Sequence, residues 1–374
     1  MKGEKLYIYN KSKKYILIYI FFINILEKIS YLAKKKNKTF PEKIEKILLV
    51  SPAHIGDTII STICFLPLKE NYKDSKIDVL CGSWGKNTYD NSKYINNIYV
   101  LDHFFLNRKK VNFFIKLKKF VVQYIKAIFF LRKNQYDLVI FLKSGIKGNL
   151  GSLIVGLNSK FYVGFEGMGF EKLLDVKTKF DFNIHEKDNF LKLLKSIPKF
   201  ELQEKKYMYK VPFIKDEILE VYCKKNMQEA KERILINYEG GDIKRILSKE
   251  KVVEIIKKVS KNTNKIYLIA TRNNNDKNFQ ILEQLKKIGI NNIEVLPQVD
   301  NIFKLGYFLQ RIDKVITVDT AITHLASFYV DDITVLYYND FGYINNPKRF
   351  YPNCKNYKNI VSKTENIDDI EFTI

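Results

Sequence analysis

The protein has 374 residues, of which 46% are hydrophobic and 28% are charged, and its 64 basic residues outnumber its 41 acidic residues by 23. This composition is typical of a globular protein of two or three domains, and the 16 glycines and 8 prolines are too few for a collagen-like or Pro/Gly-rich disordered chain. Because no apolar run reaches the roughly 20 residues of a membrane-spanning helix, the sequence excludes a multi-pass transporter.

The basic surplus is concentrated in two segments of the chain. Residues 1–46 contain twelve lysines and four glutamates, and residues 107–133 contain nine basic residues and no acidic one, so the two segments together carry 17 of the 23 surplus charges. This concentration indicates a polyanionic partner, either an anionic lipid surface or a nucleic acid. We expect the lipid surface and no nucleic acid, because both segments are apolar and no nucleic-acid recognition motif is present.

Both basic segments combine their lysines with large apolar residues. Tyr15–Leu26 is a twelve-residue apolar run flanked by lysines, which favours a helix lying in a membrane interface; a plain docking helix and a signal peptide are the alternatives. Residues 107–133 have the pattern of a basic amphipathic helix. A core helix with a solvated lysine face fits that second segment too, and both descriptions can hold at once.

After a basic, apolar extension at residues 1–43, short apolar runs alternate with helical patterns. Continuous apolar runs of this kind predict parallel strands buried on both faces, with the helices as crossovers. The predicted strands are Lys46–Val50, Lys76–Leu80, Ile98–Leu101, Asp137–Phe141 and Phe161–Val163. The predicted helices are 57–70, 110–132 and 147–156. Residues 166–212 are less regular, and we assign them to the end of a first domain over residues 44–212 and its connection.

The same alternation starts again in a predicted second domain over residues 213–374. Its predicted strands are Ile234–Asn237, Lys265–Ala270, Ile293–Leu296, Lys314–Val318 and Ile333–Leu336. Its predicted helices are 249–260, 276–288, 301–311 and 320–329. The fold class is therefore α/β, with two facing Rossmann-like domains and a cleft between them. Ligands of such sheets bind outside the carboxyl ends of the strands, so candidate site residues are expected just after strands.

The turn after the first strand reads Ser-Pro-Ala-His-Ile-Gly-Asp, residues 51–57. Gly56 allows a sharp turn or a close approach of the backbone to a ligand. Asp57 stands at the start of the following helix, where it is either an N-cap or a general base.

Two further turns lie in the second domain. Residues 318–324 read Val-Asp-Thr-Ala-Ile-Thr-His, and amides at this helix start would bind a phosphate; the alternative is a cap at Asp319 or Thr320 with His324 packed on the sheet. Residues 238–245 read Tyr-Glu-Gly-Gly-Asp-Ile-Lys-Arg. Paired glycines followed by two cations are typical of a diphosphate pocket, although a solvated surface loop fits as well.

Together, these motifs resemble glycosyltransferase family 9, the ADP-heptose:lipopolysaccharide heptosyltransferase family. The segments concerned are the turn at residues 51–57 with its helix, the Lys-Arg pair of the glycine loop and the segment from residue 318 to 327. The resemblance runs from about residue 44 to 345 and implies the GT-B fold, inversion at the anomeric carbon and no obligatory metal. Scattered histidines and the lack of a zinc spacing also predict no metal site, and no cofactor is expected.

The resemblance also implies roles for individual residues. Asp57 matches the family's proposed catalytic base, and Lys147 matches a basic position of the acceptor loop. His54, in the same turn as Asp57, is the second expected acceptor-binding residue. Ala321 stands where the family usually has a glycine. The expected donor-binding residues are Lys244, Arg245, Gly240, Gly241, Asp319, Thr320, Ala321 and His324.

The sequence therefore predicts a cytoplasmic glycosyltransferase, peripheral on the inner face of a bacterial inner membrane. It would transfer a heptose from ADP-heptose to a lipopolysaccharide core or another lipid-linked or polysaccharide acceptor. Four cysteines without a CxxC pair agree with reduced thiols in the cytosol. The alternatives are a transferase or epimerase of the same fold that uses another nucleotide sugar, and an inactive glycan-binding homologue.

Overall fold

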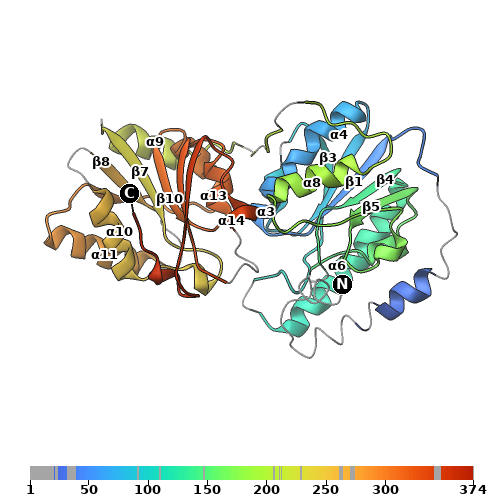
Figure 1. The fold of residues 1–374 in the computed structure, drawn as a ribbon, viewed down its shortest axis with the longest axis horizontal. Coiled ribbons are helices and arrows are strands. Elements are labelled where there is room, and N and C mark those ends of the chain that lie inside the picture. Colours follow the sequence, from blue (N-terminus) through green and yellow to red (C-terminus); the bar gives the residue numbers. More distant parts are fainter. Residues whose placement is uncertain are drawn as a thin grey trace. The chain divides into compact units, whose positions relative to one another are not determined.

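The computed structural model describes most of the chain and divides it into two compact units, Met1–Pro212 and Phe213–Ile374 (Figure 1). The described residues are 21, 24–31, 39–90, 92–108, 111–145, 148–204, 207–209, 211, 213–227, 230–260, 264–269, 274–340 and 347–373. The apolar run at residues 15–26 lies outside this part except for residue 21 and residues 24–26, which are helical. No helix of the described residues is both long and apolar enough to cross a membrane.

The first unit is built on a parallel six-stranded sheet with the order β3-β2-β1-β4-β5-β6. Its strands are β1 (Lys46–Ser51), β2 (Lys76–Cys81), β3 (Ile95–Val100), β4 (Leu138–Phe141), β5 (Phe161–Phe165) and β6 (Val176–Thr178). The order is that of a Rossmann fold, and it reverses between β1 and β4.

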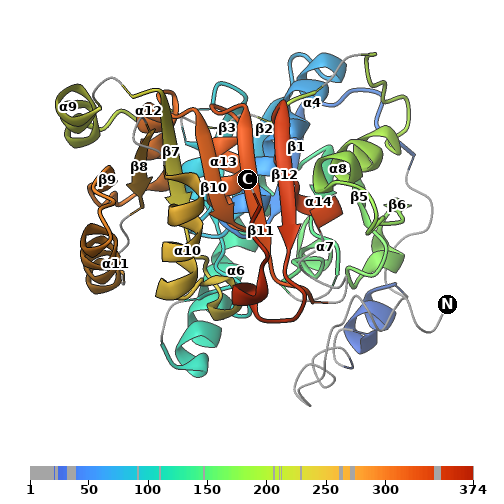
Figure 2. The same ribbon diagram turned by 60° about the vertical axis from the view of Figure 1, so that its left-hand side comes forward.

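The second unit repeats this arrangement, with the order β12-β11-β10-β7-β8-β9 (Figure 2). Its strands are β7 (Glu232–Asn237), β8 (Asn264–Leu268), β9 (Ile293–Val295), β10 (Lys314–Val318), β11 (Asp332–Tyr337) and β12 (Asn356–Val361). All of the pairings are parallel, and here the order reverses between β7 and β10. The predicted α/β class and its two Rossmann-like domains are confirmed.

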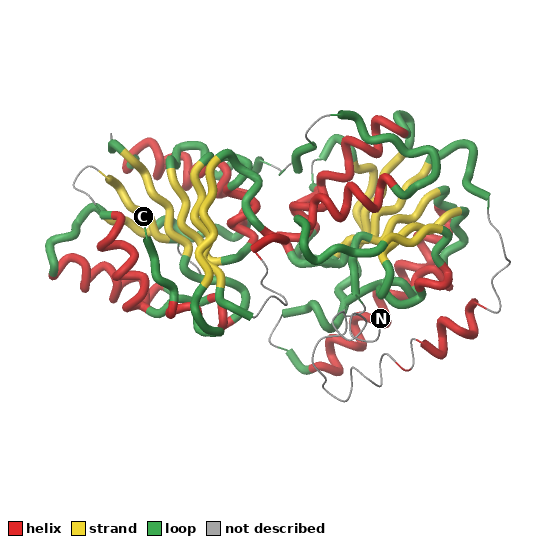
Figure 3. The backbone as a smooth tube through the Cα atoms, viewed as in Figure 1, coloured by secondary structure: helices red, strands yellow, loops and turns green. Residues whose placement is uncertain are grey.

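Helices cover the faces of both sheets, as the tube in Figure 3 shows. Those of the first unit are α3 (Ile55–Ser61), α4 (Phe65–Asn71), α5 (Lys86–Tyr89), α6 (Phe113–Asn134), α7 (Leu153–Gly156) and α8 (Glu186–Lys195), with 3-10 turns η1 (Thr62–Cys64) and η2 (Glu171–Leu173). Those of the second are α9 (Glu217–Asn226), α10 (Lys249–Val259), α11 (Asn275–Lys287), α12 (Gly306–Leu309), α13 (Ala321–Ala326) and α14 (Pro347–Phe350), with 3-10 turns η3 (Ile243–Arg245), η4 (Ile302–Leu305) and η5 (Ile367–Asp369).

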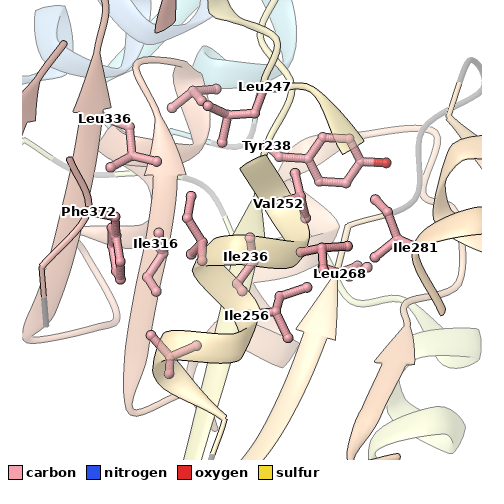
Figure 4. Close-up of a cluster of buried hydrophobic side chains, with 14 of the residues drawn as sticks. Ile236, Tyr238, Leu247, Val252, Ile256, Leu268, Ile281, Ile316, Leu336 and Phe372 are labelled. Carbon is pink, nitrogen blue, oxygen red and sulfur yellow. The ribbon is translucent and has the colours of Figure 1, made fainter. Parts of the chain in front are cut away.

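The core of the second unit shows why the sequence folds in this way (Figure 4). Ser248 caps α10 by accepting a hydrogen bond from the backbone of Lys251. Val252 and Ile256 then follow one another at helical spacing and pack in one cluster with Ile236 of β7. Burial of a large aliphatic side chain contributes about 1.5–3 kcal/mol, so this apolar face is what fixes α10 on the sheet.

One prediction about the elements is wrong. The helix predicted at residues 147–156 is a single turn, α7, because Gly148 adopts a positive φ of 82° that ends any regular helix there. Residues 166–212, predicted as the less regular end of the first domain and its connection, contain β6 and α8. In α8 the apolar residues Phe190, Leu193 and Leu194 recur at helical spacing and are buried, and the surrounding charges obscure this pattern.

Candidate active site

The candidate residues follow the strands at which each sheet reverses its order. His54 and Asp57 come after β1, and the loop predicted to bind the acceptor comes after β4, the neighbour of β1 in the first sheet. The glycine loop comes after β7, and the Asp-Thr turn comes after β10, its neighbour in the second sheet. In open α/β sheets, ligands bind outside the carboxyl ends of the strands at such reversal points. Each unit therefore presents its predicted residues where a ligand site is expected.

The turn after β1 places Asp57 in the first turn of α3, where it is half-buried. The N-cap of α3 is His54, whose backbone carbonyl accepts from the amide of Thr58 at 2.9 Å. Asp57 is thus not the N-cap, so of the two interpretations of this residue the general base is the one that stays a prediction. The His54 ring lies 6.2 Å from that of Trp84, between centroids.

A set of neutral hydrogen bonds holds the Asp57 turn in place. Trp84 donates from Nε1 to the carbonyl of Ala53 at 2.7 Å, and the hydroxyls of Thr58 and Thr88 are 2.8 Å apart. Residue 85 beside this pair has to be glycine, because a Cβ there would lie only 2.8 Å from Cγ2 of Thr58. The sequence analysis did not single out these residues, since their partners lie about 30 positions away and share no motif with them.

The loop after β4, which the sequence predicts to bind the acceptor, is described only in part. Lys147, the predicted acceptor-binding lysine, lies outside the described residues. Next to it, Asn149 donates from its side-chain amide to the carbonyl of Lys143 at 2.6 Å and accepts from the amide of Gly151 at 2.7 Å. This amide holds the two ends of the loop together.

The glycine loop after β7 folds back on itself. The amide of Gly240 donates to the carbonyl of Arg245 at 2.9 Å, and the amide of Leu247 donates to that of Tyr238 at 3.0 Å. A Cβ on Gly240 would lie 2.7 Å from Cβ of Arg245 and 3.2 Å from Cγ2 of Thr320, so only glycine fits. Gly240 therefore lets the glycine loop pack directly against the turn after β10. Gly241, the second glycine of the pair, is exposed.

Arg245 joins this loop to the turn after β10. Its guanidinium Nη1 lies 3.1 Å from the carboxylate Oδ2 of Asp319 and 3.1 Å from the backbone carbonyl of the same residue. Asp319 is buried and the Arg245 side chain is only 22% exposed. Because both groups are largely removed from water, this ion pair fixes the position of the two segments.

Thr320 is the N-cap of α13 and forms a capping box with Thr323. Its hydroxyl also accepts from the side-chain amide of Asn237 at 3.2 Å, so the end of β7 is tied to the start of α13. Ala321 is the first residue of this helix. His324 is buried, as expected if it packs on the sheet. The structure thus brings together four of the predicted donor residues: Gly240, Arg245, Asp319 and Thr320.

Lys244 stands apart from that cluster, on the exposed part of the same loop. Its ammonium lies 2.7 Å from the carboxylate of Glu365 and 5.6 Å from the ring centroid of Tyr338. The hydrogen bond with Glu365 raises the pKa of Lys244 above its ordinary value, so the lysine is charged at neutral pH. The sequence analysis missed Glu365 because 121 residues separate it from Lys244.

The arrangement in the second unit is suited to an anionic ligand. Arg245 is paired with a buried carboxylate, that of Asp319, whereas the half-exposed Lys244 is paired with a half-exposed one, that of Glu365, and stands near the exposed Gly241. Lysine acts on phosphates as a point charge, and it does not require a fixed geometry. Across the described ranges, no cluster of three or more His, Cys, Asp or Glu side chains is placed to hold a metal ion.

Comparison with known proteins agrees with the family that the sequence motifs resemble. The model of glycosyltransferase family 9 (heptosyltransferase) matches residues 126–369. The chain is 24% identical over 292 residues to lipopolysaccharide heptosyltransferase 1 of Campylobacter coli, across 75% of this chain and 80% of that protein.

Solved structures with the same fold include a family 9 glycosyl transferase from Veillonella parvula, with a TM-score of 0.64, 16% identity and coverage of 87% of this chain and 88% of that one. The E. coli ADP-heptose lps heptosyltransferase II gives a TM-score of 0.64 with 14% identity, covering 86% and 92% of the two chains. The E. coli heptosyltransferase WaaC with ADP gives 0.62 with 14% identity, covering 86% and 95%.

The two Rossmann-like units share the GT-B fold of these structures, and the family match makes the chain a glycosyltransferase. The family model covers more than half of the chain, including every predicted donor residue. The chain belongs to glycosyltransferase family 9.

Proposed function

We propose that the protein transfers a heptosyl group from ADP-heptose to the core of lipopolysaccharide, with inversion at the anomeric carbon. The observation that carries this proposal is the family match over residues 126–369, which includes the glycine loop and the turn after β10. The names of the relatives support it, since a lipopolysaccharide heptosyltransferase and an enzyme bound to ADP share sequence or fold with this chain. Under this proposal, residues 44–212 bind the acceptor and residues 213–374 bind the donor.

The proposed chemistry assigns the base to the first unit. Asp57 takes the proton of an acceptor hydroxyl while that oxygen forms a bond to the anomeric carbon of the donor. The half-buried position of Asp57 in the first turn of α3 supports this role. The hydrogen bonds of Trp84 with Ala53 and of Thr58 with Thr88 fix the conformation of the turn. His54 on the same turn and Lys147 in the loop after β4 are the proposed contacts to the acceptor.

The leaving group belongs to the second unit. As the new bond forms, the bond from the anomeric carbon to the diphosphate breaks, and its electron pair leaves with ADP. Lys244 neutralises the charge that develops on the diphosphate, and the exposed Gly241, together with Ala321 at the start of α13, offers backbone amides to it. The amides of Gly240 and Thr320 donate to Arg245 and Thr323, so these two residues shape the surface on which the diphosphate lies. The Arg245–Asp319 pair keeps these two segments in position.

We place the reaction at the cytoplasmic face of the inner membrane, where a nucleotide sugar and a lipid-linked acceptor are both available. The basic character of residues 107–133 supports a peripheral location, because anionic lipid attracts clustered lysines. Reduced cysteines agree with it, since Cys64, Cys81, Cys223 and Cys354 are free thiols.

The test measures transfer and donor choice separately. Purified protein is incubated with ADP-heptose and lipopolysaccharide from a heptose-deficient strain, and ADP release and the mass of the product are followed with and without EDTA. Thermal shifts with ADP-heptose, UDP-sugars and GDP-sugars rank the donors. A larger thermal shift and faster turnover with a UDP- or GDP-sugar would show that the donor is that nucleotide sugar and not ADP-heptose. Donor binding without transfer or epimerisation would instead indicate an inactive glycan-binding protein.

A further inference from the structure

The helix α6 is attached to the first unit along one side only. Ala127 and Leu131 are its buried residues, and Phe120, Tyr124 and Ile128 pack against the same core. Figures 1 and 2 show the helix at the margin of the unit. The opposite side of this 22-residue helix therefore faces away from the sheet.

That outer face is apolar, although helix faces exposed to water are normally polar. Phe114, Val121, Ile125 and Phe129 recur seven, four and four residues apart, which places them on one side of the helix. Ile115, Val122 and Phe130 extend this stripe. All seven side chains are between 45% and 74% exposed. A contiguous apolar patch of this kind on a globular protein marks a contact surface.

The charges on α6 separate into two groups. On the inner side, Lys119 forms an ion pair with Asp102 at 2.6 Å, and Lys116 donates to the carbonyl of Asn107 at 2.8 Å. On the outer side, the exposed lysines 118, 126 and 133 stand among the apolar residues. The chain contains no acidic residue between Asp102 and Asp137, so nothing in this stretch of sequence compensates them.

We propose that the outer face of α6 docks on an anionic phospholipid bilayer, with the helix lying in the interface and the phenylalanines entering the headgroup boundary. Apolar side chains interleaved with lysines fit such a surface, because the rings enter the apolar region while the ammonium groups reach the phosphates. A second copy of this chain is a poor occupant of the same face, since it would bring another acid-free basic helix against the first.

A second apolar helix of the same unit points to the same partner. In residues 24–31 the side chains of Ile25, Leu26 and Ile29 are exposed, whereas Glu27 is buried and accepts a hydrogen bond from the amide of Lys172 at 2.8 Å. The acidic residue thus faces the protein and the apolar ones face solvent, which is the reverse of an ordinary surface helix. This orientation suits a helix whose outer side meets lipid.

The docking inference shares with the proposed function only the premise that the acceptor is carried by a membrane. The experiment uses the full chain and vesicles without any acceptor, so transfer does not enter the readout. Co-sedimentation is measured with phosphatidylglycerol-containing vesicles and with pure phosphatidylcholine vesicles, at low and high salt. Urea unfolding of each variant, followed by the fluorescence of Trp84 in the same unit as α6, is measured alongside as a check on folding.

Two sets of substitutions on α6 separate the apolar and electrostatic contributions. The apolar set is Phe114→Ser, Ile125→Ser and Phe129→Ser, and the basic set is Lys118→Gln, Lys126→Gln and Lys133→Gln. The matched control is Ile218→Ser with Val221→Ser on α9, whose side chains are 67% and 63% exposed. We expect each α6 set to lower the partition onto anionic vesicles at least tenfold, and the basic set to remove most of the salt dependence. The α9 control should bind as the wild type does.

Several outcomes would overturn the docking proposal. Equal binding of the wild type to both kinds of vesicle, or unchanged vesicle binding by both α6 sets with the Trp84 unfolding curve intact, shows that this face does not recognise anionic lipid. A wild type that forms dimers and separates into monomers on the apolar substitutions, with no vesicle binding, assigns the face to a second copy. Failure of heptose transfer with vesicle binding intact would remove the proposed function and leave the docking surface in place.

Discussion

Two strand-to-helix turns carry the two aspartates of the candidate site, and their surroundings differ. Asp319, after β10, is buried and paired with Arg245, and the neighbouring Thr320 closes the helix start with a capping box. Asp57, after β1, is half-buried in the first turn of α3. Its turn is held by the hydrogen bond between the hydroxyls of Thr58 and Thr88 and by that from Trp84 to the backbone. A carboxylate neutralised by a cation is suited to holding two segments together, whereas a carboxylate at an accessible helix turn is suited to meeting a substrate hydroxyl.

Substitution of Asp57 should have the largest effect on activity if this contrast is correct. We expect Asp57→Asn to lower turnover by about 10²–10⁴-fold, the usual contribution of a general base, while the affinity for ADP stays unchanged. The measurement is steady-state transfer together with calorimetric titration of ADP. The matched control is Asp74→Asn, an exposed aspartate outside the candidate site, which should turn over normally. Near-normal turnover of Asp57→Asn would remove the residue from the mechanism.

The next largest effect concerns the exposed cation of the donor loop. Lys244→Ala should weaken ADP binding about tenfold or more, because a charge-assisted contact to the diphosphate is lost. The matched control is Lys257→Ala, an exposed lysine on α10. Calorimetry at two salt concentrations checks the result, since the difference between Lys244→Ala and the wild type should shrink at high salt. Equal ADP affinity of the two variants would contradict the phosphate role of Lys244.

Substitution of the two aspartates should also affect the free energy of unfolding to different extents. Asp319→Asn should lower the free energy of unfolding of the second unit by about 1–3 kcal/mol, because it leaves the largely buried guanidinium of Arg245 without its counter-charge. Asp57→Asn should lower stability less, by about 0.3–1 kcal/mol, because it removes a half-buried carboxylate that interacts favourably with the N-terminal end of α3.

Urea unfolding can assign this loss to one unit. Circular dichroism follows both units, whereas the fluorescence of Trp84, the single tryptophan, follows only the first. The Asp319→Asn loss should therefore shift the dichroism curve and leave the fluorescence curve in place. If Asp57→Asn proves the more destabilising of the two, the structural and chemical roles assigned to the two aspartates are reversed.

Much of this site follows from local sequence patterns. Apolar runs such as Lys314–Val318 identify buried strands, and a glycine or aspartate directly after such a run marks a strand end. The pattern does not determine which strands are neighbours. The pairings of β1 with β4 and of β7 with β10, which create the two reversal points, arise only from the three-dimensional packing.

The features that the sequence did not reveal are contacts between distant residues. Arg245 and Asp319 are 74 positions apart, and nothing in either motif indicates that one neutralises the other. The hydrogen bond from Trp84 to Ala53 in the Asp57 turn likewise joins residues that are distant in the sequence. β12 was missed for a different reason: as an edge strand it is largely exposed, so it lacks the continuous apolar run that identifies the central strands.

The smallest expected effect tests the pair that Lys244 forms in this structure. Glu365 holds the Lys244 ammonium at 2.7 Å, and an incoming diphosphate would have to displace this carboxylate. Both side chains are about half exposed, and such pairs are weak, so Glu365→Gln should strengthen ADP binding by no more than about fivefold. Glu371→Gln is the control, because Glu371 pairs with Lys363 instead. In a Lys244→Ala background, Glu365→Gln should have no effect, since the cation for which it competes is gone. Weaker ADP binding by Glu365→Gln alone would mean that the carboxylate orients the lysine toward the diphosphate and does not compete with it.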